Sequence, residues 1–435
     1  MQKNNTLKQF IKYVSLNILG MIGFSVYVLA DTVFIADKLG SLGLAALNIA
    51  IPAFSVMQAL GLMLGIGGAT KYAVYREQGN TTAARKMFSD TLCFGLGVAA
   101  VLITLGVFFS RNIASVLGAD GEIIDDTAIY IKTFLCFAPI FITNNVLIAF
   151  VRNDGKPLLS MTAMLISSFS NVVLDYVFIF PCNMGMFGAA FATCVSALMS
   201  FSVLITYTVL KSKTLKIKLT IPKISSVKNI IKLGMSSFVT ELSSAVVIIA
   251  FNLVIAAISG NTGIAAYGMI VNTALVVISI FTGIAQGIQP LVSNAYAHSE
   301  KAVMKRTFVY ALILELFIAA AVYAVVFVFS ENIIAIFNNE NNVQLIPIAK
   351  TGFEIYFAGF FFAGFNIISS AYLSAGERAV NAFIISIMRG LVIILPSVIM
   401  FAMLFGMNGV WFSFVFAEIL TSIIAVICMS LKKNK

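Results

Sequence analysis

Long apolar runs separated by short polar segments extend through the whole chain. Mainly apolar stretches of about 20 or more residues can cross a bilayer as helices, and in lipid only a helix or a closed barrel satisfies its own backbone. The alternating pattern of barrel strands is absent. We therefore predict an all-α membrane protein with twelve transmembrane helices, at residues 10–36, 44–75, 88–110, 127–151, 157–180, 187–210, 229–258, 263–296, 307–330, 345–374, 379–404 and 408–431.

The second half of this pattern repeats the first. At a shift of 220 residues the coinciding pairs are Gly40 and Gly260, Gly43 and Gly263, and Gly67 and Gly287. At a shift of 221 they are Asn145 and Asn366, Gly155 and Gly376, Gly185 and Gly406, and Gly188 and Gly409. An even number of spans in each copy makes both copies enter the membrane in the same direction. We predict two pseudo-symmetric six-helix lobes around a central cavity.

One basic connector lies where the two copies meet. Its sequence is KSKTLKIKLTIPKISSVK, between the sixth and seventh predicted spans. We predict an N-lobe at residues 1–210, a cytoplasmic inter-lobe linker at 211–228 and a C-lobe at 229–435. No soluble domain is expected between the spans.

Composition and charge agree with this topology. Of 435 residues, 60% are hydrophobic and 11% charged, which is too little polar surface for a soluble protein of this size. Most of the 28 Lys and Arg residues lie in segments that are cytoplasmic if the N-terminus is inside, as the positive-inside rule favours. We predict a multi-pass plasma membrane protein with both termini cytoplasmic. Topology and contact with anionic membrane lipids explain the net charge of +10 without nucleic acid.

Several residue types carry no predicted chemistry. The five cysteines lack the spacing of a metal site or a disulfide framework, and the only histidine, His298, falls in a predicted cytoplasmic loop. The glycines at 61, 65, 67 and 68 lie within a span, so they indicate close helix packing and not a phosphate loop. We expect no cofactor and no enzymatic activity, because no nucleophile–base cluster is evident in the spans.

We single out seven ionisable residues inside the predicted spans, where insertion of a charge costs about 2.5–3.5 kcal/mol. They are Asp31, Asp175, Glu241, Glu315, Glu354, Glu418 and Arg389. Glu418 and Arg389 lie in adjacent spans within reach of each other, which predicts a structural ion pair. Glu241 and Glu354 are possible transport acids of the C-lobe, whereas Glu315 either lines the cavity or pairs locally.

A polar cluster is predicted in the outer third of the N-lobe. Asp31 and Asp175 share one depth, and Asn171 lies one turn before Asp175 on the same helix face. Tyr130 and Thr193 reach this level from two further helices. Two carboxylates in a low-dielectric pocket do not both ionise readily, so such a cluster binds a proton or a hard cation such as Na⁺. The alternative is structural: Asp31 caps a helix end and Asp175 pairs with Asn171.

Two stretches carry specific motifs. Residues 30–52, ADTVFIADKLGSLGLAALNIAIP, contain D-T-x-F, and residues 170–180, SNVVLDYVFIF, contain N-x-x-x-D-x-x-F-I-F. With the duplicated layout, they resemble the multidrug and toxic compound extrusion (MATE) family, particularly its DinF-like bacterial members. The family usually has a proline early in the first helix, where Leu16 stands here.

The resemblance implies a site and an activity. The implied cation- or proton-binding site consists of Asp31, Tyr130, Asn171, Asp175 and Thr193. Asp31, Asn171 and Asp175 would hold the metal ion if the coupling ion is Na⁺. Glu241 is similar to the C-lobe cation-site acid of NorM-like relatives. The implied activity is antiport of organic cations against H⁺ or Na⁺.

We predict a secondary active multidrug efflux transporter that exchanges lipophilic organic cations for H⁺ or Na⁺ by alternating access. A monomer holds a complete pathway. One alternative is a lipid-linked oligosaccharide flippase of the same superfamily, which generally needs basic residues in its cavity. Six of the seven residues singled out above are acids and only one is an arginine, which argues against it. A passive channel is a further alternative, which uphill transport would exclude.

Overall fold

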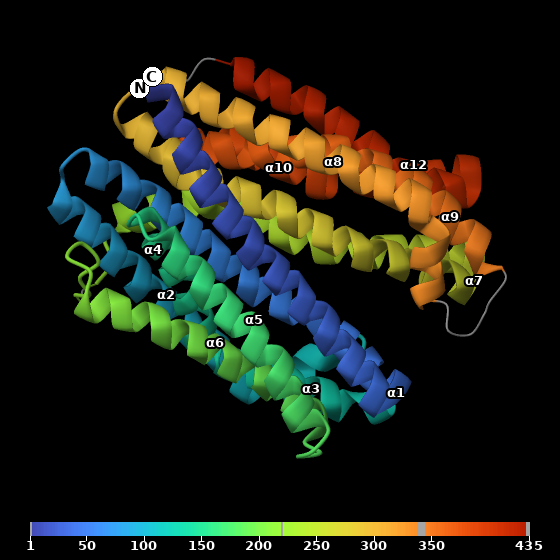
Figure 1. Cartoon of the computed structure of the whole chain (residues 1–435). Helices are drawn as coiled ribbons and strands as arrows, with labels where there is room; N and C mark the ends of the chain where they lie inside the picture. Colours follow the sequence, from blue (N-terminus) through green and yellow to red (C-terminus); the bar gives the residue numbers. More distant parts are fainter. Residues whose placement is uncertain (1, 219–220, 338–343, 432–435) are drawn as a thin grey trace.

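The computed structural model describes residues 2–218, 221–337 and 344–431 (Figure 1). Within these ranges every regular element is a helix, so the predicted all-α class is confirmed. Nine described helices are long and apolar enough to cross a membrane, or ten if the bent pair Gly121–Cys136 and Ala138–Asn153 forms one span. The predicted multi-pass topology is therefore supported by helix length and composition.

The helices follow the two halves of the chain. The N-lobe contains α1 (Gln2–Glu77), α2 (Thr81–Val116), α3 (Ile124–Cys136), α4 (Ala138–Asn153), α5 (Pro157–Ile179) and α6 (Gly185–Leu210). The C-lobe contains α7 (Ile224–Ala297), α8 (Lys301–Phe337), α9 (Leu345–Tyr356), α10 (Phe360–Ala375), α11 (Ala379–Ile387) and α12 (Ile394–Ser430). The connector between the lobes is attached to the N-lobe. Its Ser212 and Thr214 side chains donate hydrogen bonds to Asp154, which directly follows α4. Helix α7 begins inside the predicted linker 211–228.

Three long helices turn sharply at a glycine. Helix α1 breaks at Gly40 (φ 67°), α7 at Gly260 (φ 56°) and α12 at Gly406 (φ 58°). Glycine adopts this left-handed conformation without the clash of a Cβ atom. Gly40 and Gly260 are repeat partners, as are Gly406 and Gly185, which has φ 57° at the start of α6. Each break divides a long helical segment into two parts: α1 at Gly40, α7 at Gly260 and the α11–α12 segment at Gly406. Each part is long enough for one membrane span, which favours the predicted count of twelve.

Three predicted spans contain irregular turns in the described chain where the sequence pattern indicated continuous helices. The span 127–151 is bent by 52° between α3 and α4. Pro139 at the start of α4 has no N–H to continue the backbone ladder of α3. The span 345–374 contains a 3₁₀ turn at Phe357–Gly359, and a π-helical turn at Met388–Val392 follows α11.

Glycines allow close helix contacts, as predicted for the 61–68 cluster. A Cβ atom on Gly65 would lie 2.8 Å from the carbonyl oxygen of Asn145 in α4. A Cβ atom on Gly67 would lie 2.1 Å from the carbonyl oxygen of Ile230 in α7. Its repeat partner Gly287 approaches Val14 of α1 in the same way, with 2.8 Å to the Cα atom. Two symmetry-related crossings of α1 and α7 thus join the lobes.

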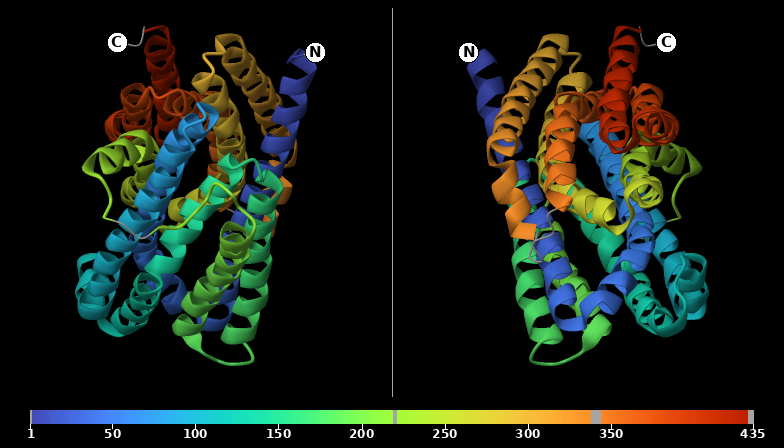
Figure 2. Two further views of the ribbon diagram at one scale, coloured as in Figure 1. Left: turned by 90° about the vertical axis from the view of Figure 1, so that its left-hand side faces the viewer. Right: turned by 90° about the vertical axis from the view of Figure 1, so that its right-hand side faces the viewer.

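The lobes meet at the end that carries both termini and diverge toward the other end (Figure 1). Each lobe has its own apolar core, and the two cores exchange helix ends. Phe10 and Val14 of α1 belong to the core of the C-lobe, whereas Ile230 of α7 belongs to that of the N-lobe. The Phe10 ring lies 5.7 Å from that of Tyr310, and Figure 2 shows the start of α1 beside α8. This exchange closes one end of the molecule.

Candidate functional site

The residues predicted to form the N-lobe cluster converge inside that lobe. Asp31, Asn171 and Asp175 are buried, and so are Tyr130 and Thr193. The Asn171 side-chain amide donates to Thr193 Oγ1 over 3.0 Å. Asp31 and Asp175 lie close enough to interact electrostatically, and Tyr130 interacts with both. The structure therefore brings together side chains from α1, α3, α5 and α6.

Four acceptor oxygens of this cluster lack donors in the described part of the chain. Both carboxylate oxygens of Asp175, Oδ1 of Asp31 and Oδ1 of Asn171 are buried without a hydrogen-bond partner among the described residues. A buried acceptor in this state is costly, and a proton or a hard cation would satisfy it. The structural alternative has little support: the described hydrogen bonds include none between Asp175 and Asn171, and Asp31 lies within α1, nine residues before its break at Gly40.

Tyr27 is a neighbour of this cluster that the sequence analysis missed. It lies one turn before Asp31 on α1, a spacing that was available as a signal. Its hydroxyl group interacts electrostatically with Asp31, Asp175 and Glu241. Tyr27 and Thr193 also line the central cavity, whereas the described lining does not include the two aspartates. The cluster therefore meets the cavity at Tyr27 and Thr193.

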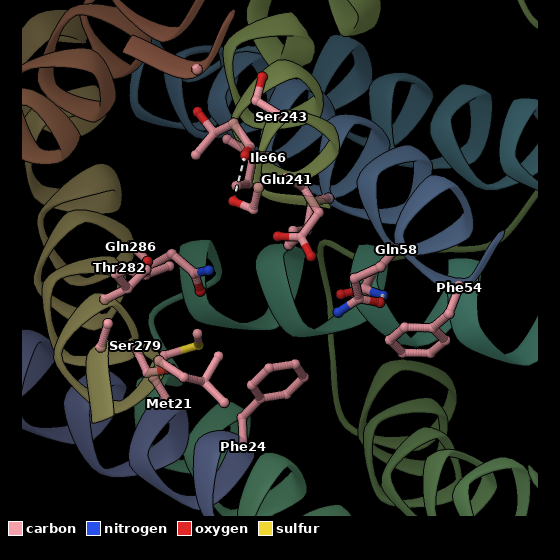
Figure 3. Close-up of a pocket in the computed structure, with 18 of the residues that line it drawn as sticks. Met21, Phe24, Phe54, Gln58, Ile66, Glu241, Ser243, Ser279, Thr282 and Gln286 are labelled. Carbon is pink, nitrogen blue, oxygen red and sulfur yellow. Dashed lines mark hydrogen bonds between the residues drawn. The ribbon is translucent and has the colours of Figure 1, made fainter. Parts of the chain in front are cut away.

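A central cavity of about 320 Å³ lies between the lobes. Phe24, Phe54 and Gln58 line it from the N-lobe, and Glu241 and Gln286 face them from the C-lobe (Figure 3). Apolar walls with a few convergent polar groups are typical of a small-molecule site. The cavity thus has the size and lining of a site for a compact organic molecule.

Among the described residues, four charged side chains line this cavity. Arg389 Nε and Glu418 Oε1 form the predicted ion pair, 2.6 Å apart. Asn366 Nδ2 donates to Glu418 Oε2 over 2.8 Å. Glu241 has neither a hydrogen bond nor an ion pair among the described contacts. The carboxylate of Glu241 is therefore available to a ligand.

Arg152 is the fourth charged residue of the cavity lining, and it is buried instead of lying at the surface. It directly follows the predicted span 127–151, where a surface segment is expected, yet only 1% of it is exposed. Its Nη1 donates to Asn17 Oδ1 and to Gln286 Oε1, each over 2.7 Å. Helices α1 and α7 cover the end of α4, which the pattern along α4 does not reveal. The buried charges therefore include a second arginine.

The remaining in-span acids lie away from the cavity. Glu354 does not line it and interacts electrostatically with Lys350, so its transport role stays a prediction without support from this geometry. Glu315 is buried, and a Cβ atom on Gly364 of α10 would touch its carboxylate. Asp90 of α2 is fully buried with both oxygens unpaired among the described residues. The sequence analysis overlooked it because it lies at the very start of a predicted span.

Polar contacts between the lobes gather at the end that carries the termini. Lys71 Nζ lies 2.6 Å from Glu377 Oε1. Gln289 donates to Thr70 Oγ1 over 3.0 Å and accepts from Asn153 Nδ2 over 2.7 Å. We call these five residues, with the two α1–α7 crossings, the inner closure. Nearby, His298 lies in a half-exposed loop, as expected, 3.2 Å from Glu77.

Comparisons with known proteins agree with this architecture. The family model described as MatE matches residues 17–177 and 236–400, one range in each lobe. The chain belongs to the MATE family. The first MATE range contains Asp31, Asn171 and Asp175, and the second contains Glu241 and Arg389. The predicted family is confirmed, and the DinF-like branch stays a prediction.

Relatives of this MATE chain match it over nearly its full length. The multidrug export protein MepA of Staphylococcus saprophyticus is 26% identical over 436 residues, which cover 100% of this chain and 96% of the relative. MepA of Staphylococcus aureus is 25% identical over 437 residues, with coverage of 100% and 96%. Both relatives are named as export proteins and not as enzymes.

Solved structures share the fold. A MOP superfamily transporter from Pyrococcus furiosus superposes with a TM-score of 0.91 at 23% identity, covering 99% of this chain and 97% of that one. An outward-facing multidrug resistance MATE transporter superposes with a TM-score of 0.91 at 22% identity, with coverage of 97% and 94%. The membrane transporter fold is therefore shown for this chain.

Proposed function

We propose that this MATE transporter exports lipophilic organic cations in exchange for H⁺ or Na⁺. Multidrug export by its relatives supports the activity. The observation that carries the proposal is the group of buried, donor-free oxygens of Asp31, Asn171 and Asp175 beside a cavity lined by both lobes. Such a group is stable only when it holds a proton or a cation.

Coupling follows from a shared electrostatic field. When the N-lobe cluster is empty, its negative charge acts through Tyr27 on the nearby cavity, because charges interact strongly in a low-dielectric interior. An organic cation then binds against Glu241 and the aromatic wall formed by Phe24 and Phe54. When H⁺ or Na⁺ binds at Asp31 and Asp175, with Asn171, Tyr130 and Thr193 around them, the field is neutralised and the cation is released. Ion and substrate thus compete without sharing one pocket.

Alternating access is part of the proposal. With both termini cytoplasmic, as the distribution of Lys and Arg favours, the inner closure seals the cytoplasmic side and the diverging lobes face outward (Figure 1). The opposite state requires the lobes to separate at the inner closure and to meet at the other end. We expect a monomer in the plasma membrane to perform this cycle, with lipid around its apolar surface.

The flippase alternative has weaker support. A diphosphate needs several basic groups, and the two cavity arginines are already engaged, Arg389 by Glu418 and Arg152 by two amides. A passive channel requires a continuous path, whereas the inner closure here blocks one end of the cavity.

Transport into proteoliposomes tests the proposal. Wild-type protein should accumulate an ethidium-like cation uphill when a pH or Na⁺ gradient is imposed, with the two gradients varied separately. Asp31→Asn and Asp175→Asn should each lower the coupled rate at least about tenfold, as expected when a required charge is lost. Asp125→Asn, at an exposed ion pair with Arg111, is the matched control and should retain the wild-type rate. Wild-type exchange by both cluster variants would show that the assigned ion site is wrong.

A further inference from the structure

The N-lobe cluster has polar neighbours on its inner side, toward the chain termini. On α1, Tyr27 lies one turn inward of Asp31, and on α5, Ser167 lies one turn inward of Asn171. Both Tyr27 and Ser167 line the central cavity. Thr193 of α6 lines it as well, and accepts a hydrogen bond from Asn171 over 3.0 Å. On this side the cluster is therefore connected to the cavity through hydroxyl groups.

On its outer side the same cluster is covered by apolar residues. On α1, Ile35 lies one turn outward of Asp31, and on α5, Ile179 lies one turn outward of Asp175. Ala189 holds the corresponding place on α6, and all three apolar side chains are 0% exposed within the N-lobe core. The described cavity lining includes none of them. An ion inside such a layer would lose its hydration without compensation, so the layer blocks its passage.

Aromatic rings close the seam between α1 and α5 at the level of this layer. The ring of Phe34 lies 5.9 Å from that of Phe180 and 6.3 Å from that of Tyr176. Tyr176 and Phe180 stack on each other at 5.3 Å. On α3, Thr127 is fully buried, and its hydroxyl donates to a backbone carbonyl one turn away. We call the combined layer the outer seal; it consists of Phe34, Ile35, Tyr176, Ile179, Phe180 and Ala189.

We propose that the outer seal makes the central cavity the route by which the coupling ion enters and leaves the N-lobe cluster. This inference rests on the proposed exchange function and concerns the path of the ion. Asp31 lies only nine residues before the outer break at Gly40, so an unsealed cluster would be open to the outside in both states of the cycle. With the seal, the cluster is open only to the side that the cavity faces. The ion then changes sides only when the lobes move, as coupled exchange requires.

An ion leak without substrate tests the seal. Ile179→Ser removes buried methyl groups beside Asp175 and leaves room for water, so the inward-open state would connect both sides of the membrane through the cluster. Proteoliposomes that contain a pH-sensitive dye receive an external acid pulse, with valinomycin and K⁺ to balance charge. Wild-type vesicles should hold the pH gradient, and Ile179→Ser vesicles should lose it severalfold faster. Uptake of radioactive Na⁺ by the same vesicles is the equivalent measurement for Na⁺.

Two further variants show whether a leak passes through the cluster. Ile142→Ser is the matched control, because Ile142 is equally buried in the same core but faces Gly95 of α2. It should leave the vesicles as tight as wild type. Adding Asp175→Asn to Ile179→Ser should stop the leak. A tight Ile179→Ser variant, an equal leak in Ile142→Ser, or a leak that persists in the double variant would overturn the inference.

Labelling of single cysteines tests the route in the purified full-length protein and decides the matter if Ile179→Ser does not fold. The five native cysteines are first replaced by alanine. Ile179→Cys keeps a small apolar side chain in the outer seal, whereas Ser167→Cys puts a thiol on the half-buried cavity wall. A charged methanethiosulfonate reagent should modify Ser167→Cys and leave Ile179→Cys unmodified. Modification of Ile179→Cys at the rate of Ser167→Cys, or no modification of Ser167→Cys, would contradict the proposed route.

Both measurements omit the organic cation, so their outcome is separate from that of the export assay. A sealed outer side and a labelled cavity wall, with no gradient-driven export, would refute the proposed function and leave the ion route standing. Gradient-driven export with an outer side that is open to the reagent would do the reverse.

Discussion

Buried charges in this protein fall into two classes that differ in their partners. Arg389 and Glu418 are paired at 2.6 Å, and Asn366 satisfies the second carboxylate oxygen. Asp175 and Glu241 have no such partners among the described residues. Paired charges of this kind offset each other's cost of burial, whereas unpaired ones mark candidate binding sites for ions and substrates.

The buried ion pair of Arg389 with Glu418 leads to a prediction about stability. Arg389→Met leaves the Glu418 carboxylate buried and uncompensated, so we expect it to destabilise the protein by about 3–5 kcal/mol. Adding Glu418→Leu should recover most of this loss, because the double variant buries no unpaired charge. Thermal unfolding in detergent measures both. A single variant as stable as wild type would show that the ion pair does not contribute to stability.

At the level of elements, the two copies of the repeat share backbone conformation but not the polar side chains of the N-lobe cluster. Gly40 and Gly260 have the same left-handed break, with φ of 67° and 56°. The polar cluster was not repeated: at the same shift Asp31 falls on Phe251, which is buried in the core of the C-lobe. The proposed ion-binding cluster therefore has no equivalent at the Asp31 position of the second copy.

The break in α7 predicts a conformational cost. Gly260→Ala introduces a Cβ atom at φ 56°, although no other atom lies within 4 Å of it, so backbone strain alone should destabilise the protein by about 1–2 kcal/mol. Gly268→Ala is the matched control on the same helix, with equal space and ordinary helical geometry. It should be neutral or stabilising by up to about 1 kcal/mol. Equal melting temperatures of the two variants would contradict the role of the break.

In the whole molecule, closure at one end depends on backbones that touch. The crossings of α1 and α7 are symmetric, with Gly67 against Ile230 and Gly287 against Val14. Lys71 and Glu377 add an ion pair beside them, although a partly exposed pair of this type contributes little. Close packing at glycine is therefore the main support of the inner closure.

The close contact at the inner closure leads to a prediction for a glycine-to-alanine substitution. Gly67→Ala would place its Cβ atom 2.1 Å from the Ile230 carbonyl oxygen, so the lobes must separate there and the inward-open state should gain population. Distances between spin labels on the cytoplasmic ends of the two lobes should lengthen. Gly97→Ala, with open space around it, serves as control. An unchanged distance distribution in Gly67→Ala would show that the crossing does not hold the closure.

Local patterns were enough to predict the helical class, the duplication and the N-lobe cluster. Apolar runs long enough to span a bilayer determine helices, and Asn171 and Asp175 share a face because helical spacing requires it. The ion pair of Glu418 with Arg389 followed from depth along neighbouring spans. Glycine positions indicated close packing, because a repeated glycine has few other uses inside a span.

The tertiary structure alone decided which polar residues meet. Arg152 appeared to be at the surface because it follows an apolar run, and only the covering of α4 by α1 and α7 buries it. Tyr27 became part of the site because its hydroxyl interacts electrostatically with acids from both lobes. Periodicity along one helix determines which face a residue occupies. What that face meets depends on how the helices pack, and no single helix contains that information.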